Sequence, residues 1–272
     1  MDITFDLTDK VAVITGGAGI LCSEMSRQLG ARGVKVAVLD IDGDGAKEVA
    51  KEIVDAGGDA IGLKVDVLDK NSLIESKEKV MDKYGRVDIL INGAGGNRAD
   101  ATTGDDMSFF DLPIDALQWV FNLNFMGAVL TTQVFGKIMA EQGEGNIINI
   151  SSMAAIRPLT RVIGYGAAKA SIDNFTKWMA IYLNQNHSKN IRVNAIAPGF
   201  LLTQQNYYLL VDEDTGGDTA RGKSIKDHTP MGRYGKPQEL IGAIIWLVSD
   251  AASFVNGTVI PIDGGFSAFA GV

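Results

Sequence analysis

The chain has 272 residues, of which 46% are hydrophobic and 21% are charged, a composition typical of one large or two small globular domains. Its 25 basic and 33 acidic residues give a formal net charge of −8, which argues against nucleic-acid binding.

Three features predict a soluble, cytoplasmic protein with no membrane partner. Cys22 is the single cysteine, so no intramolecular disulfide can form and a reducing compartment is expected. The first residues, MDITFDLTDK, do not combine a basic start with an apolar stretch, so we expect no secretory signal. No apolar run approaches the roughly 20 residues that span a bilayer.

Short runs rich in β-branched residues recur along the chain and alternate with amphipathic stretches, such as 73–84, 116–139 and 170–184. This alternation is typical of a parallel sheet covered by helices on both faces. We therefore predict one α/β domain over residues 1–272, a doubly wound Rossmann fold with a seven-stranded parallel sheet. The predicted strands are 11–15, 34–39, 60–65, 87–91, 146–150, 192–197 and 259–262.

Two segments break the alternation. Residues 96–113 are polar and acidic, with a pair, Phe109 and Phe110, that we expect to be exposed. Residues 201–235 have weak periodicity and several glycines. Because loops of this length in a compact domain are usually functional or mobile, we predict that residues 201–235 form a substrate lid that orders when ligand binds.

The first predicted strand leads into the glycine-rich sequence TGGAGILCSEM. Such a turn lets backbone N–H groups approach a pyrophosphate at a helix N-terminus, although a plain tight turn uses the same glycines. Asp40 ends the second strand, and no arginine is among the next four residues. An acid there accepts hydrogen bonds from ribose hydroxyls and repels a 2′-phosphate, so it predicts NAD rather than NADP; capping of a loop is the alternative.

Further residues are expected at the same carboxyl edge of the sheet, where open α/β sheets bind ligands. They follow the third and fourth strands, and the glycines among them could also be simple turn formers. The expected cofactor-binding residues on this edge are Gly16, Gly19, Ile20, Leu21, Asp40, Asp66, Val67, Asn92, Ala94 and Gly95.

Tyr165 and Lys169 are four residues apart, so on a helix they share one face. Ser152 ends a predicted strand, and the intervening loop can bring it beside Tyr165. An ammonium near a phenol lowers the phenol's pKa, which lets the tyrosine exchange a proton with an alcohol, while the serine polarises a carbonyl. A solvated helix pair is the alternative for Tyr165 and Lys169. We expect no covalent nucleophile and no metal, because neither Ser152 nor the histidines have suitable partners nearby in sequence.

Together these residues resemble the short-chain dehydrogenase/reductase family over essentially the whole chain. The matching elements are Thr15-Gly16, Asp40, Asp66-Val67, NGAG at 92–95, Asn124 in NLNFMG, Ser152, Tyr165, Lys169, Pro198-Gly199 and Thr203. The pattern departs from the family's T-G-x-x-x-G-x-G turn, because Ile20 and Cys22 stand where it has glycines. We expect the turn to follow an altered path.

The resemblance implies four catalytic residues. Tyr165 would be the general acid/base, and Ser152 would orient the carbonyl. Lys169 would bind the nicotinamide ribose and lower the pKa of the tyrosine, while Asn124 would hold a proton-relaying water. Without the resemblance, Asn124 would be an ordinary polar helix residue. Thr203, after Pro198 and Gly199, would contact the nicotinamide carboxamide.

Several segments are most similar to the branch of the family that interconverts D-mannonate and D-fructuronate with NAD(H). They are GAGGN, FFDL, NLNFMG, ISSMAA, HTPMGRYGKP and DGGFSAF. A sugar acid needs a carboxylate anchor and hydroxyl partners. The candidates are Asn97, Arg98, Arg157, Arg161, Gln204, Gln205 and Asn206, together with Ser152 and Tyr165. Each arginine could instead be a solvated loop residue.

Two other functions remain open from the sequence. One is a gluconate 5-dehydrogenase-like or other polyol dehydrogenase, and the other is an NAD-binding regulator without turnover. The intact Asn124, Ser152, Tyr165 and Lys169 favour an enzyme. Apolar residues on the helices 116–139 and 170–184, which family members commonly pair across a two-fold axis, predict a homotetramer.

Overall fold

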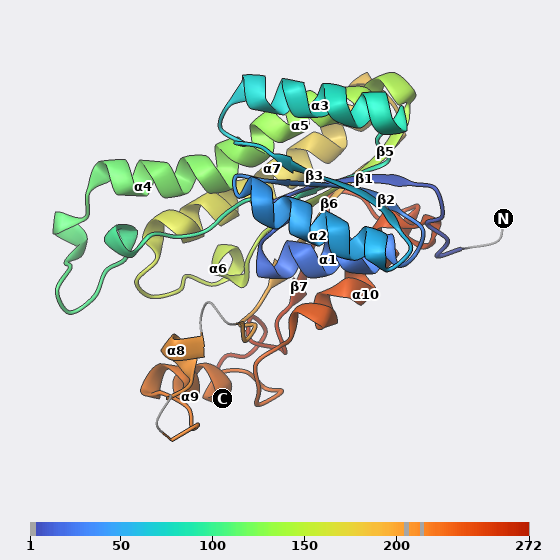
Figure 1. The fold of residues 1–272 in the computed structure, drawn as a ribbon. Coiled ribbons are helices and arrows are strands. Elements are labelled where there is room, and N and C mark those ends of the chain that lie inside the picture. The colour runs from blue at the N-terminus through green and yellow to red at the C-terminus, as the bar shows by residue number, and fades with distance from the viewer. Residues whose placement is uncertain (1–3, 204–206, 213–214, 272) are drawn as a thin grey trace.

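Seven parallel strands form one sheet in the order β3-β2-β1-β4-β5-β6-β7 (Figure 1). The computed structural model describes residues 4–203, 207–212 and 215–271. The predicted single α/β domain with a seven-stranded parallel sheet is confirmed, and each predicted strand is present within about two residues. The strands are β1 (Val11–Thr15), β2 (Lys35–Asp40), β3 (Asp59–Lys64), β4 (Ile89–Asn92), β5 (Glu144–Ile150), β6 (Asn190–Pro198) and β7 (Val259–Ile262).

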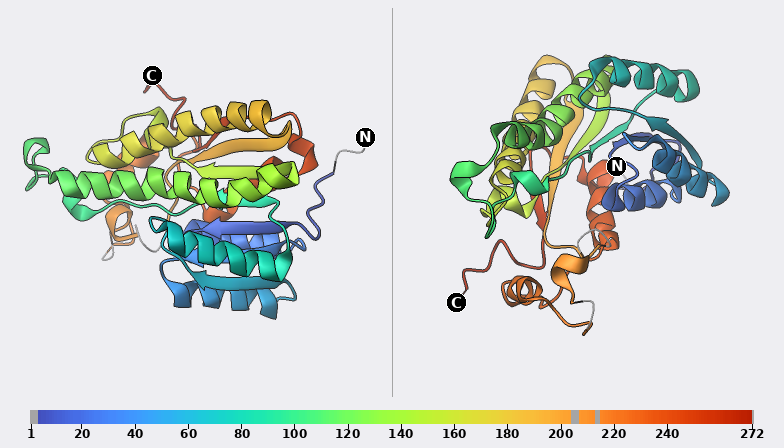
Figure 2. Two further views of the ribbon diagram at one scale, coloured as in Figure 1. Left: turned by 90° about the horizontal axis from the view of Figure 1, so that it is seen from above. Right: turned by 60° about the vertical axis from the view of Figure 1, so that its left-hand side comes forward.

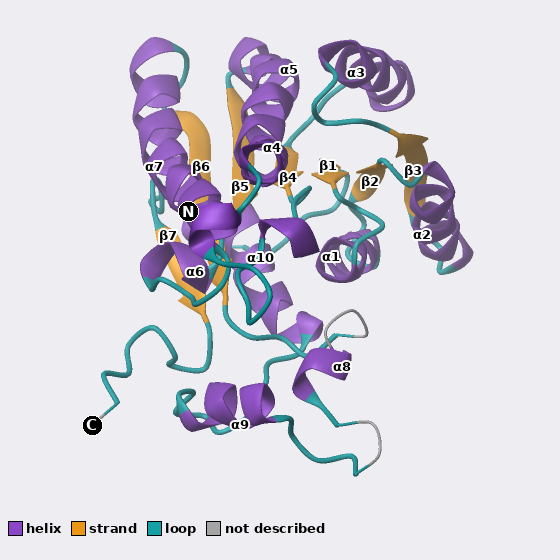
Figure 3. Ribbon diagram, turned by 90° about the vertical axis from the view of Figure 1, so that its left-hand side faces the viewer, coloured by secondary structure: helices purple, strands orange, loops and turns teal. Residues whose placement is uncertain are grey.

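Helices cover both faces of the sheet, and Figure 3 shows the strands between the two layers. One layer consists of α1 (Ile20–Gly30), α2 (Gly43–Asp55) and α10 (Ile241–Val248), and the other of α3 (Lys70–Tyr84), α5 (Gly127–Gln142) and α7 (Ile163–Asn186). The shorter helices are α4 (Ile114–Phe121), α6 (Met153–Ile156), α8 (Tyr207–Leu210) and α9 (Ala220–Asp227). Single turns are η1 (Ala99–Ala101), η2 (Phe109–Asp111), η4 (Pro237–Leu240) and η5 (Asp250–Ala252).

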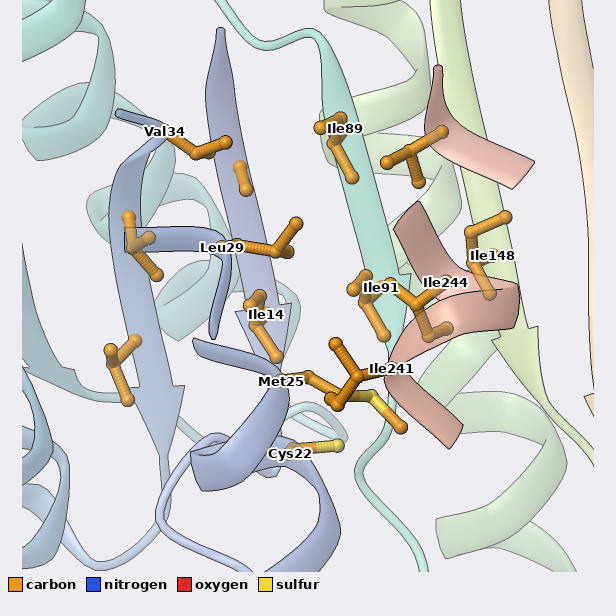
Figure 4. Packing of buried hydrophobic residues seen from close by; sticks show 14 of the residues in the cluster. Ile14, Cys22, Met25, Leu29, Val34, Ile89, Ile91, Ile148, Ile241 and Ile244 are labelled. Carbon is orange, nitrogen blue, oxygen red and sulfur yellow. The ribbon is translucent and has the colours of Figure 1, made fainter. Parts of the chain in front are cut away.

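The two layers explain why the central strands are apolar throughout. Successive side chains of a strand point to opposite faces. Ala12 and Ile14 of β1 pack with α1 and α10, whereas Val13 packs with the other layer. Figure 4 shows Ile14 within the first of these clusters. All five residues of β1 are buried. A strand buried on both faces cannot alternate apolar and polar residues, so it is read in the sequence as a continuous apolar run.

Side chains and one glycine set the ends of the connecting helices. Asp42 accepts a hydrogen bond from Gly45 N at the start of α2, and Asp69 accepts one from Asn71 N at the start of α3. Gly85 ends α3 in the left-handed conformation, with φ of 72°. Aspartate is favoured at helix N-caps and glycine at the residue that ends a helix, so these residues determine where the helices begin and end.

The helix predicted over 116–139 differs in detail from the observed one. It begins at Ile114 and continues to Gln142, but a π-helical turn, η3 (Asn122–Met126), separates α4 from α5. No proline interrupts the sequence at this turn. Such π-helical turns are frequent at functional sites, and this one contains Asn124.

Gly235, the last residue of the predicted lid 201–235, lies beside the residues that follow β6. Leu202 N donates to Gly235 O and Gly235 N donates to Phe200 O, each over 3.0 Å. Between these bonds α8 and α9 pack around a small apolar cluster of Leu210, Val211, Ile225 and Tyr234. Figure 1 and the right view of Figure 2 show α8 and α9 projecting from the sheet and its layers. Ligand-dependent ordering of this segment stays a prediction.

The exposed phenylalanine pair of the loop 96–113 is present. Phe109 and Phe110 are exposed, and their rings lie edge to face with 5.6 Å between the ring centroids.

Within the described ranges, no helix combines the length and the apolar character that a membrane span requires.

Gly62 provides a test of how tightly α2 packs on β3. A Cβ at Gly62 would lie 2.3 Å from Ala46 O, and a backbone atom cannot move aside without displacing α2. We expect Gly62→Ala to lower the free energy of unfolding by about 1–3 kcal/mol, measured by urea denaturation. Gly242→Ala, at an exposed position of α10, is the control, because nothing lies within 4 Å of where its Cβ would be. Equal stability of the two variants would contradict this packing.

Candidate active site

The site lies where the strand order reverses. β1 connects to β2 and β3 on one side, and β4 lies on its other side. Ligands bind in open α/β sheets at this point, outside the carboxyl ends of the strands. A cavity of about 830 Å³ opens here. Of the predicted residues, its lining contains Gly16, Gly19, Ile20, Leu21, Asp40, Asp66, Val67, Ala94, Gly95, Ser152, Tyr165, Lys169, Pro198, Gly199 and Thr203.

The turn after β1 lies directly against the turn after β4. Gly16 has φ of 63°, and a Cβ there would lie 2.8 Å from Ala94 Cα, so no other residue fits without movement. The turn closes through Gly19 N, which donates to Gly16 O over 3.0 Å, and α1 starts at Ile20. The first N–H groups of a helix have no intrahelical acceptor, so those of Ile20 and Leu21 are available at the cavity. The altered path predicted for this turn stays a prediction.

Cys22 is a packing residue. Its Sγ lies 2.1 Å from where a Cβ of Gly93 would be, so the thiol occupies space that the glycine leaves. Burial raises the pKa of the Cys22 thiol to about 12, which keeps it neutral near physiological pH. Figure 4 shows Cys22 at one end of the apolar cluster that contains Ile14 and Met25.

Asp40 is held at the end of β2 by backbone donors. Its Oδ2 accepts from Ala18 N and its Oδ1 accepts from Asp42 N, each over 3.0 Å. Each carboxylate oxygen can accept a further hydrogen bond. Among the described residues that line the cavity, Lys169 is the one cation.

Asn92 does not reach the cavity. Its Nδ2 donates to Thr132 Oγ1 over 3.0 Å and to Asn149 Oδ1 over 2.8 Å, and the side chain is buried. It therefore ties β4 to β5 and α5. The sequence placed Asn92 with its neighbours Ala94 and Gly95, but the last residue of a strand can point to either side of the sheet edge.

Ser152, Tyr165 and Lys169 come together as predicted. Ser152 follows β5 and accepts from Ala154 N over 3.1 Å, and its hydroxyl is hydrogen-bonded to that of Tyr165. Tyr165 and Lys169 lie on α7, which begins at Ile163. Lys169 Nζ donates to Ile150 O over 2.7 Å and lies 5.5 Å from the centroid of the Tyr165 ring.

Burial decides the protonation of this group in the protein alone. It raises the pKa of Tyr165, against the smaller opposing effect of the Ser152 hydrogen bond. It also lowers the pKa of Lys169 to about 8. The sequence predicted that Lys169 lowers the pKa of Tyr165, and this effect of the lysine stays a prediction. Phenolate and ammonium both lose hydration in the cavity wall, and for Tyr165 this loss of hydration raises the pKa in the protein alone.

Asn124 links the π-helical turn to the loop after β4. Its Oδ1 accepts from Gly96 N over 3.1 Å, and its Nδ2 donates to Gly96 O over 2.6 Å and to Val120 O over 2.8 Å. A Cβ at Gly95 would lie 2.5 Å from Asn124 Oδ1 and 3.3 Å from Lys169 Nζ. The amide, the glycine and the ammonium are therefore immediate neighbours beneath the cavity.

The predicted substrate-binding arginines are not among the residues that line the cavity. Arg98 pairs with Asp100 over 2.6 Å, and its guanidinium lies over the ring of Trp119, which does line the cavity. Arg157 Nε donates to Ser267 O over 2.9 Å, and Arg161 is exposed, with φ of 77°.

Asn97 is occupied locally, since its Nδ2 donates to Thr102 Oγ1 over 2.8 Å. Gln204, Gln205 and Asn206 lie outside the described residues. The sequence analysis did not place Ser151, Trp119 or Phe200 at the cavity, which all three line. Ser151 had a usable signal, because it directly precedes Ser152 at the end of a strand. In the described ranges, no group of three or more His, Cys, Asp or Glu side chains is arranged to hold a metal ion.

Comparison with known proteins places this geometry in a family. The family model for enoyl-(acyl carrier protein) reductase matches residues 18–267. The chain is 48% identical over 276 residues to the uncharacterized oxidoreductase UxuB of Bacillus subtilis, with 98% of each chain covered. A solved short-chain type dehydrogenase/reductase from Mycobacterium marinum superimposes with a TM-score of 0.84 at 30% identity, over 96% of this chain and 97% of the other. The chain belongs to the short-chain dehydrogenase/reductase family. It is an oxidoreductase that acts on CH–OH groups.

Two further relatives concern sugar acids. A solved structure from Haemophilus influenzae, provisionally described as a D-mannonate oxidoreductase with bound NAD, has a TM-score of 0.92 and 45% identity, with 98% of each chain covered. The 2-dehydro-3-deoxy-D-gluconate 5-dehydrogenase of Dickeya dadantii is 35% identical over 267 residues, covering 97% of this chain and 98% of that enzyme.

Proposed function

We propose that this protein interconverts a hydroxyl and a keto group on a sugar acid, the pair being D-mannonate and D-fructuronate, with NAD(H) as cofactor. The observation that supports this most is that Asp40 lines the same cavity as Ser152, Tyr165 and Lys169. The likeness to the Haemophilus influenzae protein supports the choice of substrate.

The described residues fit NAD(H). The close approach of Gly16 to Ala94 and the start of α1 leave backbone N–H groups for a pyrophosphate. Both carboxylate oxygens of Asp40 can accept hydrogen bonds from ribose hydroxyls. Among the described lining residues, none beside Asp40 is a cation that could bind a 2′-phosphate. Pro198, Gly199 and Thr203 line the cavity after β6, where we place the nicotinamide carboxamide. When bound, the nicotinamide supplies or accepts the hydride.

The chain's own residues handle the proton. In the reductive direction we assign Tyr165 as the acid that protonates the oxygen of the reacting carbonyl, and its raised pKa keeps the phenol protonated near neutral pH. Ser152, hydrogen-bonded to the same phenol, orients that oxygen. Lys169 holds a ribose, and Asn124, bonded to the loop after β4, holds the water that returns a proton towards Lys169.

A second candidate substrate is a gluconate-type acid or another polyol. The Dickeya dadantii relative supports it, because that protein is named as a dehydrogenase of a gluconate-type acid. The presence of Asn124, Ser152, Tyr165 and Lys169 in the packed structure favours an enzyme over an NAD-binding regulator without turnover. We retain the cytoplasm as the expected location.

We infer that the protein is a homotetramer. Trp178 and Ile181 of α7 are 55% and 58% exposed, and Trp178 stacks on Tyr182 at 4.9 Å, which leaves an apolar face for a second copy. Phe135 is one of the apolar residues of the predicted helix 116–139 that we expected on the pairing surface. It is instead fully buried, because α5 turns it onto the sheet.

Tyr165→Phe tests the proton transfer. It removes the hydroxyl and keeps the ring, so turnover with a keto-sugar acid should fall by about 10²–10⁴-fold. NADH affinity, measured by fluorescence titration, should change little. Retention of about a tenth of wild-type turnover would remove Tyr165 from the proposed mechanism.

Asp40→Ala tests the choice of cofactor. The variant loses acceptors for the ribose and a charge that repels a phosphate, so NADH should bind more weakly and the preference over NADPH should narrow. Dissociation constants for both cofactors measure this. Equal use of NADH and NADPH by the wild-type protein would contradict the role of Asp40.

Alanine variants of Arg98, Arg157 and Arg161 test the carboxylate anchor. A charge-assisted hydrogen bond is worth about 1.5–3 kcal/mol, so loss of the anchor should raise KM for a sugar acid by roughly one to two powers of ten. KM for a neutral keto-sugar should barely change. If all three variants alter charged and neutral substrates equally, the anchor lies elsewhere and the sugar-acid assignment loses its support.

A further inference from the structure

Lys169 is a buried ammonium with few partners. Its side chain is 4% exposed, and its Nζ donates to the backbone oxygen of Ile150 over 2.7 Å. A backbone oxygen satisfies a donor but carries no full charge. A buried cation without an opposite charge favours its neutral form, and burial lowers the pKa of Lys169 to about 8. This pKa already includes the effect of the charges that act on Lys169, so an anion close to the lysine is part of what keeps it protonated at neutral pH.

Asp173 is the anion in position to do so. It lies four residues after Lys169 on α7, so the two side chains emerge on the same face of the helix one turn apart. Its carboxylate is partly buried and accepts a hydrogen bond from Ser151 Oγ. Ser151 lines the cavity and directly precedes Ser152. The carboxylate is therefore held at the end of β5, beside the reacting group.

The other groups that face this pair do not replace Asp173. Cys22, from α1, acts on Lys169 only as a thiolate, and its pKa of about 12 keeps it a neutral thiol. Tyr165, on α7, has a raised pKa and is likewise neutral. Lys177, one turn beyond Asp173, is exposed and adds positive charge to the Asp173 side. Burial raises the pKa of the Asp173 carboxyl, and the hydrogen bond from Ser151 opposes that rise. Of the described groups that act on Lys169, Asp173 is thus the one carboxylate.

We propose that Asp173 is a positioning residue, held by Ser151, that keeps the Lys169 ammonium charged in the wall of the cavity. Its effect on turnover rests on the function proposed above, but its effect on Lys169 does not. The carboxylate favours the protonated lysine, so its removal should lower the pH at which Lys169 loses its proton. Between that lowered pH and about pH 8, Lys169 of the variant is neutral, whereas the wild-type lysine is still protonated.

The direct test measures the titration of Lys169 in the protein without cofactor. Lysines are acetylated competitively with a limiting amount of acetic anhydride between about pH 6 and 11, and the peptide that contains Lys169 is quantified by mass spectrometry. In Asp173→Asn, which keeps the size of the side chain and an acceptor for Ser151, the Lys169 midpoint should fall by about 0.5–1 pH unit. Asp173→Glu should restore most of it. Asp115→Asn, which removes an exposed carboxylate from α4, is the matched control and should leave it unchanged.

Kinetics give the second readout. For each protein, the rate of keto-sugar reduction near pH 9 is divided by the rate near pH 6.5. This ratio should be about three- to tenfold lower in Asp173→Asn than in the wild type, because the variant loses the Lys169 ammonium at a lower pH. A role confined to stability would lower activity at both pH values and leave the acetylation midpoint in place. If Asp173→Asn does not fold, Ser151→Ala replaces it and should shift the midpoint in the same direction by a smaller amount. An unchanged Lys169 midpoint in the folded variant overturns the proposal, whatever the substrate proves to be.

Discussion

The contact between the turns that follow β1 and β4 is the constraint on which the site depends. Thr15 Oγ1 accepts hydrogen bonds from Gly93 N and Ala94 N over 3.1 and 3.3 Å, and Gly16 leaves no space for a Cβ against Ala94. This contact sets the start of α1 beside the loop that carries Gly95 and Gly96. Asn124 then holds that loop, and Lys169 lies against it. The residues proposed to bind the cofactor phosphates and those proposed to transfer the proton are thereby parts of one packed unit.

Burial organises the chemistry of this unit as well as its shape. Lys169 and Asn124 are 4% and 1% exposed. Asn124 donates both of its amide hydrogens to backbone carbonyls, and Lys169 donates to Ile150 O. Hydrogen bonds in a low-dielectric setting hold such groups in place, which orients them before any ligand arrives. The same setting opposes charge on both Tyr165 and Lys169. A nearby fixed charge, such as Asp173, therefore has more influence here than it would in water.

The residues proposed to bind the substrate lie in loops, whereas those proposed to bind the cofactor lie mostly at the ends of strands. Arg98 follows β4, and Arg157 and Arg161 lie between α6 and α7. Arg98 is paired with Asp100, and Arg157 donates to Ser267 O. Under the function proposed above, a substrate carboxylate would compete with these partners. Relatives that share the fold can consequently differ in substrate without changing the sheet or the residues that handle the proton.

The sequence by itself determined the features that depend on local order. Buried strands are continuous apolar runs, a four-residue spacing places Tyr165 and Lys169 on one helix face, and the last residues of parallel strands meet at one edge. These rules predicted the seven strands and the place of the cavity, and together with the family resemblance they predicted about half of its lining residues, including Asp40 and Ser152. Each of them needs only the periodicity of a segment and the direction of its strand.

Only the tertiary structure decided which way individual side chains turn and how deeply they are buried. Asn92 points to Thr132 and Asn149 rather than the cavity, and the π-helical turn places Asn124 on Gly96. The direction of the Tyr165 pKa shift and the bond between Ser151 and Asp173 likewise arise between segments far apart in sequence. Desolvation depends on every atom that surrounds a group, and those atoms come from separate strands and helices, so no local pattern records it.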